Sequence, residues 1–201
     1  MKTIRPALTL LLTMTVITGF VYPLIVTGIA QALFPRRANG SLVVEHGRPI
    51  GSRLIGQAFV APDDFWSRPS ATTPRPYDAL DSGGSNLGPT NPALVAAVSA
   101  RIAALRAADP GNRAPVPVDL VTASASGLDP DISLAAAEYQ AGRIARARGL
   151  ALATVRALIA AHADRRWLGL FGEPRVNVLE LNRALDALSA TPRRGPGRPD
   201  G

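Results

Sequence analysis

The pattern of apolar and polar positions divides the chain into one long uncharged segment and a mixed remainder. Residues 7–34 form 28 consecutive positions without a charged side chain. A helix needs about 20 residues to cross the roughly 30 Å hydrocarbon layer of a bilayer. The pattern therefore predicts a single transmembrane helix over 7–34, preceded by a short basic N-terminus over 1–6.

A cleaved signal peptide is the alternative interpretation of this segment. Lys2 and Arg5 supply a basic start, and Ala30-Gln31-Ala32 is similar to a cleavage site. The apolar core of such peptides spans about 7–15 residues. This one is roughly twice as long, contains Pro23 and ends before Arg36-Arg37, so we expect it to remain as an anchor. Basic residues stand on both sides of it, so the positive-inside rule does not choose its orientation.

Small residues four positions apart recur within the apolar segment. They are the pairs Thr9 and Thr13, Thr15 and Gly19, and Gly28 and Ala32. This spacing lets two helix backbones approach closely, but it also arises by chance in a helix rich in Ala, Gly and Thr. The pattern leaves open whether the helix packs against a partner helix.

Residues 35–189 carry the alternating helix and strand signals of one mixed α/β soluble domain. Residues 41–59 contain two short β-prone runs separated by a Gly and Pro break, and they predict a hairpin. Residues 61–92 hold six prolines and three glycines without a sustained period, which predicts a long loop. Its aromatic residues favour an ordered loop, since disordered segments contain few of them.

Capping residues and apolar periods predict the elements that follow the loop. Asn91 before Pro92 starts a helix whose apolar residues repeat until Asp109. Ser133 starts a second long helix that ends at Gly149. The other predicted elements are a strand over 116–123, a polar loop over 124–131, a helix around Val155, Leu158 and Ile159, and a short strand over 175–178. A last helix begins at a capping box of Asn177 and Glu180 and carries Leu181, Leu185 and Leu188.

Composition removes several classes of chemistry. The chain has no cysteine and two histidines, which excludes a disulfide scaffold, a thiol nucleophile and thiolate metal sites and argues against a zinc enzyme. The net charge is +7 with an isoelectric point near 11.1, but the excess lies at the two ends and in Arg36-Arg37. The body is nearly neutral, which argues against nucleic acid as a ligand. Residues 190–201 consist mainly of Pro, Gly and Arg and predict a disordered tail.

A glycine-rich block is the first candidate binding site. It reads Ser82-Gly83-Gly84-Ser85-Asn86-Leu87-Gly88. Its backbone amides could face an anion, as in other glycine-rich turns, and a turn before the next helix is the simpler interpretation. The phosphate loop of Walker-type ATPases ends in Lys followed by Ser or Thr, and Lys2 is the one lysine of the chain. The block is therefore not a Walker phosphate loop.

The polar loop over 124–131 is the second candidate. Its candidate residues are Ser124, Ser126, Gly127 and Asp129. The serines lack the G-x-S-x-G surroundings of a hydrolase nucleophile, and a partnership with His46 or His162 would depend on a fold that the sequence does not predict.

Acidic pairs and aromatic anchors complete the candidate chemistry. Asp63-Asp64 and the pair of Asp129 and Asp131 lack the alternating oxygen ligands of a calcium loop, so we expect no metal site. Trp66-Ser67-Arg68-Pro69 and Trp167 suit a protein interface, and burial in the core explains the same residues equally well.

Several sequence blocks, taken together and in order, resemble one known family. They are GSRLIGQ at 51–57, SRPSA at 67–71, YD at 77–78, SGGSNLGPTN at 82–91, PVDLVTAS at 117–124, SGLDP at 126–130 and GEPRVNVL at 172–179. These blocks resemble KdpC, the C chain of the bacterial potassium-transporting Kdp ATPases. The resemblance runs from the apolar segment to about Leu188.

The resemblance implies a single-pass subunit of a complex in the bacterial inner membrane, without a hydrolytic site or cofactor of its own. In that complex a channel-like chain selects potassium, an ATP-hydrolysing chain drives transport, and a small peptide completes the assembly. ATP and potassium thus act at the level of the complex. The resemblance further implies that the C chain stabilises assembly and, as a catalytic chaperone, raises the ATP affinity of the hydrolysing chain. The block 82–88 is likened to a nucleotide-sensing signature.

The resemblance also places the soluble domain outside the cytoplasm, over the potassium entrance. A domain there cannot touch cytoplasmic ATP, so an effect on nucleotide affinity has to cross the complex as a coupling free energy of about 1–3 kcal/mol. We therefore expect the helix over 7–34 to dock on partner helices, and the loops 61–91 and 124–131 to cap the channel chain. Ala125 and Asp131 depart from the glycine and histidine usual in the family, which weakens a strict chemical role for the second loop.

Two other function classes remain open. A secreted or anchored extracytoplasmic binding module, unrelated to ATP hydrolysis, would begin near Leu33 if a signal peptide were removed. An anchored hydrolase would use Ser124 or Ser126 and would react with a serine-directed phosphonate.

Overall fold

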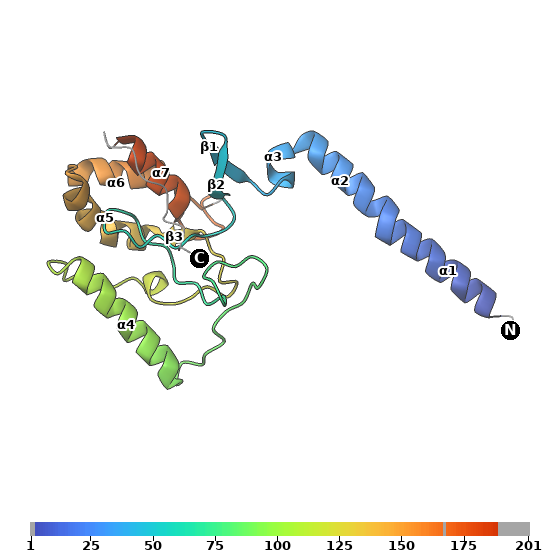
Figure 1. Ribbon diagram of the computed structural model, residues 1–201, viewed down its shortest axis with the longest axis horizontal. Helices are drawn as coiled ribbons and strands as arrows, with labels where there is room; N and C mark the ends of the chain where they lie inside the picture. The colour runs from blue at the N-terminus through green and yellow to red at the C-terminus, as the bar shows by residue number, and fades with distance from the viewer. Residues whose placement is uncertain (1–2, 167, 189–201) are drawn as a thin grey trace. The chain divides into compact units, whose positions relative to one another are not determined.

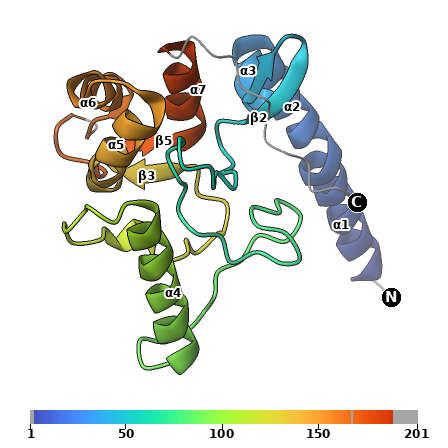
Figure 2. The same cartoon turned by 60° about the vertical axis from the view of Figure 1, so that its left-hand side comes forward.

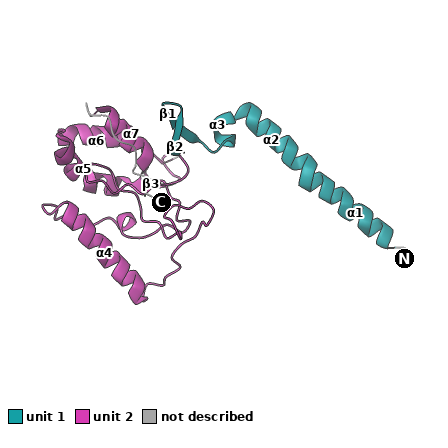
Figure 3. Cartoon of the chain, viewed as in Figure 1, with its two compact units in different colours: residues 1–52 teal, residues 53–201 magenta. Residues whose placement is uncertain are grey.

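The computed structural model describes residues 3–166 and 168–188. The chain divides into two compact units, residues 1–52 and 53–201, which Figure 3 shows in different colours. Three predictions concern residues outside the described ones: the basic charge of Lys2, the interface role of Trp167 and the disordered tail over 190–201.

The first unit begins with one continuous apolar helix (Figure 1). It consists of α1 (Ile4–Val16), a π-helical turn (Ile17–Val21) and α2 (Tyr22–Leu33), and none of its residues is buried. The whole helix spans 30 residues, which makes it long and apolar enough to cross a membrane. The helix predicted over 7–34 is confirmed, with its ends at Ile4 and Leu33.

The π-helical turn ends at Val21, two residues before Pro23. Proline has no N–H group, and in a regular α-helix its ring collides with the carbonyl group four residues earlier. In the widened turn the Tyr22 N–H donates to the Ile17 carbonyl, one residue further back than in an α-helix. The Thr18 hydroxyl donates to the Met14 carbonyl at 2.7 Å, so this polar group is satisfied within the helix.

After the apolar helix, the first unit ends in a small hairpin. The short helix α3 (Pro35–Ala38) leads into the antiparallel strands β1 (Leu42–Glu45) and β2 (Arg48–Ser52). His46 and Gly47 form the turn, with positive φ angles of 50° and 77°. The predicted hairpin is confirmed, but its second strand ends at Ser52, whereas the β-prone pattern extends to residue 59.

The second unit is built on a small antiparallel sheet with the strand order β3-β5-β4. Its strands are β3 (Asp131–Ser133), β4 (Ala163–Asp164) and β5 (Arg175–Asn177). Three helices gather beside it in Figure 2: α5 (Leu134–Arg148), α6 (Leu152–Ala161) and α7 (Val178–Leu188). The buried core includes Ile132, Ile144, Val155, Val176, Leu181 and Leu185. The predicted mixed α/β domain is confirmed.

The predicted helix starts are confirmed by side-chain caps. The Asn91 side chain accepts the N–H of the second residue of α4 (Pro92–Ala108) at 2.9 Å. Ser133 caps α5 in the same way at 3.0 Å, and Asn177 accepts the Glu180 N–H at 3.1 Å. Within α4 only one residue, Leu105, is buried. This helix therefore packs against the core mainly through its C-terminal end.

The predicted strand over 116–123 is wrong. Val118–Leu120 form a single turn of 3-10 helix instead. Pro115 and Pro117 lack the N–H groups that a strand needs for its ladder of hydrogen bonds. The true strand begins at Asp131, which the sequence pattern assigns to the polar loop. A strand of three residues is too short to show a clear alternation.

Candidate functional site

Two side-chain amides anchor the long loop that leads to the candidate site. The loop predicted over 61–92 is confirmed, because all its residues before α4 are described and none lies in a helix or strand. Asn182 of α7 accepts the Phe65 N–H at 2.8 Å and donates to the Phe65 carbonyl at 3.0 Å. Gln140 of α5 bonds in the same way to Trp66, at 2.8 and 3.2 Å. Each amide therefore satisfies the backbone groups that a neighbouring strand would satisfy.

Two buried arginines of α5 extend this anchor. The Arg143 guanidinium donates to the Asp64 carbonyl at 2.8 Å and lies 4.8 Å from the centre of the Trp66 ring. Burial lowers the pKa of Arg143 to about 10. Arg148 contacts the carboxylates of Asp64 at 3.2 Å and Asp63 at 3.7 Å. The Asp63-Asp64 pair therefore serves as an ion-pair partner of the helix.

The structure brings the two candidate loops into direct contact. The Gly83 N–H donates to the Ser126 carbonyl at 2.9 Å, and the Ser82 hydroxyl donates to the same oxygen at 3.0 Å. A Cβ atom added at Gly84 would lie 2.9 Å from the Ala125 carbonyl oxygen. The two backbones are therefore packed against each other, and we call this contact between residues 82–84 and 124–127 the loop junction.

The remainder of the glycine-rich block does not join the loop junction. Asn86 has a left-handed backbone with a φ angle of 51°, and Asn91 N–H donates to the Gly88 carbonyl at 3.0 Å as the chain enters α4. Ser85, Asn86 and Gly88 are exposed, and Leu87 is partly buried. This half of the block forms the turn before the helix, which is the simpler of the two sequence interpretations.

Side chains from the long loop support the junction from the other side. The Ser70 hydroxyl donates to the Gly127 carbonyl at 2.7 Å. The Arg68 guanidinium donates to the Thr122 carbonyl at 3.2 Å and to the Asp129 carboxylate at 3.0 Å. Because Arg68 bonds to groups before and after residues 124–127, it holds these two parts of the chain together.

Tyr77 completes this support. Its hydroxyl donates to the Arg68 carbonyl. Burial raises the pKa of Tyr77 to about 12, a shift that the Ser67 hydroxyl opposes and the Asp129 charge reinforces. A Cβ atom at Gly56 would lie 2.5 Å from both the Tyr77 ring and the Asp129 carbonyl oxygen. Glycine at position 56 therefore makes room for the ring.

Asp131 belongs to the sheet and has other partners than Asp129. Its carboxylate pairs with Arg175 of β5 at 2.9 Å and accepts from Asn177 at 3.2 Å. Burial raises the pKa of Asp131, although Arg175 and Asn177 both act to lower it. These bonds across the sheet give Asp131 a structural role.

The serines of the second loop shape that loop. The hydroxyls of Ser124 and Ser126 lie 3.5 Å apart, and the Ser126 hydroxyl accepts the Leu128 N–H at 3.1 Å. His162 stands at the end of α6, where its Nδ1 atom is 2.9 Å from the Leu158 carbonyl oxygen. Among the described residues, no group of three or more His, Asp or Glu side chains is arranged to hold a metal ion.

Sequence reasoning missed the polar residues that position the site. Asn182, Gln140 and Arg143 are buried within helices whose neighbouring positions form the apolar core. A polar side chain on the apolar face of a helix has to find a partner, so its position in the helical period was the available signal. The period alone does not say that the partner is the backbone of residues 62–66.

Residues 4–187 match one protein-family model, KdpC, described as the c chain of the K+-transporting ATPase. The chain belongs to the KdpC family. A relative from Polaromonas naphthalenivorans, named potassium-transporting ATPase KdpC subunit, is 64% identical over 194 residues, or 96% of this chain and 98% of the relative. Relatives of the same name from Methylibium petroleiphilum and Variovorax paradoxus are 66% and 65% identical over 187 residues, covering 92% and 93% of this chain and 98% and 97% of the relatives.

Family membership identifies the complex to which this chain, and with it the loop junction, belongs. The seven sequence blocks that resemble KdpC lie within the matched range, so the resemblance is confirmed. As a KdpC chain, the protein is a subunit of a potassium-transporting ATPase and assembles with partner subunits. Its single apolar N-terminal helix fits a membrane-associated subunit.

Proposed function

We propose that this KdpC chain is a non-catalytic subunit that stabilises the assembled ATPase and raises the ATP affinity of the hydrolysing chain from a distance. In this proposal the helix Ile4–Leu33 docks on partner helices in the bacterial inner membrane. The soluble domain stands outside the cytoplasm, and the loops 61–91 and 124–131 contact the channel-like chain. ATP and potassium act at the level of the complex, and the chain carries no cofactor of its own.

The loop junction carries this proposal. Polar groups of Ser82, Gly83 and Ser126 bond to one another, and Gly84 lets the two backbones touch. Because these polar groups bond to one another, they build a surface of fixed shape. Such a surface favours recognition of a partner over chemistry on a substrate. The apolar helix supports the same conclusion, because none of its residues is buried within its own unit.

Helix docking is tested by comparing three forms of the chain. They are the full chain, a chain lacking residues 1–34, and a chain in which residues 7–34 are replaced by a polyleucine helix of equal length. The last form keeps the membrane anchor and removes the specific helix surface. We expect partner subunits to co-purify with the full chain and to be lost from both altered forms. Unchanged assembly of the deleted or the polyleucine form would refute docking through the helix.

The side of the membrane is tested with a single cysteine. The chain has no cysteine of its own, and Leu80 is 97% exposed, which makes Leu80→Cys a clean labelling position. In spheroplasts that express the chain without its partner subunits, we expect a membrane-impermeant maleimide to label this variant before the membrane is opened. Labelling that requires opened membranes would place the domain in the cytoplasm and refute an indirect nucleotide effect.

The nucleotide effect is tested on the purified complex. A coupling of about 1–3 kcal/mol corresponds to a change of roughly 5–150-fold in apparent ATP affinity. We expect removal of this chain to raise the KM for ATP within that range, and we expect the isolated chain to form no phosphoenzyme. An unchanged KM would refute the chaperone role, and phosphoenzyme on the isolated chain would refute its non-catalytic nature. A mature chain that begins near Leu33 would support the secreted binding module instead.

A further inference from the structure

The apolar helix is long enough to bring the residues that follow it to the lipid headgroups. Ile4–Leu33 spans 30 residues, which gives a length of about 45 Å at 1.5 Å per residue. A bilayer is about 30 Å thick across its hydrocarbon layer and about 40–45 Å thick with its headgroup regions. A helix that spans the bilayer upright or with a slight tilt therefore ends at the level of the headgroups.

Two arginines follow the end of this helix directly. Pro35 disfavours a helical backbone at Phe34, whose φ and ψ angles are −134° and 50°, so α2 stops and the chain turns into α3. Arg36 and Arg37 lie in α3, and both are exposed. Within the described part of the chain, neither arginine forms an ion pair with a carboxylate. Their charges are therefore available to an anion from outside these residues.

An amide clasp holds α3 against the end of the apolar helix (Figure 1). The Asn39 side chain donates to the Gln31 side chain at 3.0 Å and accepts from it at 3.3 Å. It also donates to the Pro35 carbonyl at 2.7 Å. Because Gln31 belongs to α2 and Asn39 follows α3, this pair, which we call the amide clasp, fixes the position of the two arginines relative to the helix end.

The hairpin adds apolar side chains to the same unit. Leu42 and Val44 of β1 are roughly half exposed, as is Phe34 before the arginines. Residues 34–52 contain three arginines and one glutamate, so this region carries a net positive charge. A bilayer interface offers both matching partners, since acyl chains lie directly beneath anionic phosphate groups. Charge and position therefore favour an anionic phospholipid as the ligand.

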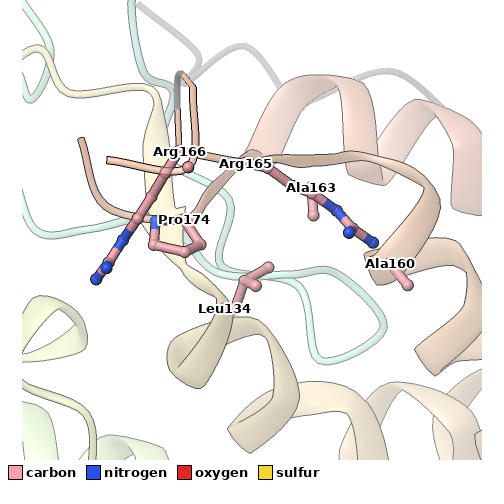
Figure 4. A pocket seen from close by; sticks show the side chains of 7 residues that line it. Leu134, Ala160, Ala163, Arg165, Arg166 and Pro174 are labelled. Carbon is pink, nitrogen blue, oxygen red and sulfur yellow. The ribbon is translucent and has the colours of Figure 1, made fainter. Parts of the chain in front are cut away.

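A second pair of adjacent arginines has a different setting. Arg165 and Arg166 border a hollow of about 570 Å³ in the second unit, and Figure 4 shows their side chains extending in opposite directions. Arg166 pairs with the Glu173 carboxylate at 3.1 Å. Substitution of this pair removes the same formal charge without changing the residues that follow the apolar helix, which makes it a matched control.

We propose that Arg36 and Arg37 bind the phosphate groups of anionic phospholipids such as phosphatidylglycerol at the end of the membrane-spanning helix. The amide clasp holds both guanidinium groups at the depth of the headgroups, and Phe34 contacts the acyl chains beneath them. This inference rests on the membrane-spanning helix of the proposed function. It requires neither a nucleotide effect nor a particular side of the membrane.

Lipid binding is measured by native mass spectrometry on the full chain in a neutral detergent. The chain is titrated with phosphatidylglycerol and, separately, with zwitterionic phosphatidylethanolamine of the same acyl chains. Lys2→Gln and Arg5→Gln are present in every form, so that the helix keeps basic side chains at one end only. We expect Arg36→Gln with Arg37→Gln to weaken phosphatidylglycerol binding about 30-fold, which corresponds to about 2 kcal/mol or about 1 kcal/mol for each arginine near an anionic lipid surface. Phosphatidylethanolamine binding should stay unchanged.

Two further variants locate the effect. We expect Arg165→Gln with Arg166→Gln to leave the binding of both lipids unchanged. Gln31→Ala keeps every arginine and opens the amide clasp, so it should weaken phosphatidylglycerol binding at least about threefold. Unchanged binding in the Arg36 and Arg37 variant, or an equal loss in the Arg165 and Arg166 variant, would overturn the headgroup site. Unchanged binding in Gln31→Ala would overturn the role of the clasp.

The outcomes separate this inference from the proposed function. A chain that binds both lipids equally well overturns the headgroup site and leaves the membrane anchor intact. A chain that binds neither lipid and stays dissolved in buffer without detergent would instead refute the membrane-spanning helix of the proposed function.

Discussion

Gly84→Ala tests whether the two motif loops are held together by close backbone approach. The added Cβ atom would lie 2.9 Å from the Ala125 carbonyl oxygen and 3.2 Å from its Cα atom, so one of the loops has to move. Overpacking of this kind costs about 1–3 kcal/mol. Gly83→Ala is the matched control, because a Cβ atom at Gly83 meets nothing within 4 Å and the Gly83 N–H is retained.

The comparison of these two variants isolates the contact. Both replace glycine by alanine, which stiffens the unfolded chain and stabilises each variant by about 0.4–1 kcal/mol. That contribution cancels in the difference between them. For a protein of this length, 1 kcal/mol shifts the thermal midpoint by about 2–4 °C. We therefore expect Gly84→Ala to unfold about 2–12 °C below Gly83→Ala in the same detergent. Equal midpoints would show that the loop junction is not a tight contact.

Three further predictions concern the support of the loop junction. Gly127→Ala forces alanine to a φ angle of 67° and places its Cβ atom 2.5 Å from the Thr72 Cγ2 atom, so we expect a loss of about 2–4 kcal/mol in chemical unfolding. Asn182→Ala leaves the Phe65 N–H and carbonyl unpaired, and should cost about 2–5 kcal/mol in the same assay. Burial raises the pKa of Tyr77 from 10.0 to about 12, so the folded state keeps its proton longer than the unfolded state. Stability should therefore fall by about 3 kcal/mol as the pH rises through this range, and Tyr77→Phe should remove that fall.

Elements marked by both a cap and an apolar period could be predicted from the sequence. Asn91, Ser133 and Asn177 each stand directly before a helix, and each accepts an N–H group from its first turn. The uncharged stretch was equally clear, because length and composition alone define a helix that can span a bilayer. These signals are local, so they survive without any knowledge of tertiary contacts.

The elements that were missed or misjudged depend on tertiary contacts. The strand β3 has three residues, and its identity comes from pairing with β5, about 45 residues later in the chain. Val116 to Ala123 has strand-like composition, yet Pro117 interrupts the ladder and Val118–Leu120 turn into a 3-10 helix. The anchoring amides Gln140 and Asn182 were missed because their partners are backbone groups more than 70 residues away.

The loop junction also bears on the proposed nucleotide effect. A phosphate cradle needs several backbone N–H groups that are free to face the anion. The Gly83 N–H, near the start of the glycine-rich block, already donates to the Ser126 carbonyl at 2.9 Å. Gly84 faces the Ala125 backbone, so an anion could use this part of the block only by separating the two loops. Residues 82–84 therefore offer no preformed phosphate cradle in the intact fold. This agrees with the proposed indirect nucleotide effect, which we expect Gly84→Ala to weaken without removing a nucleotide contact at these residues.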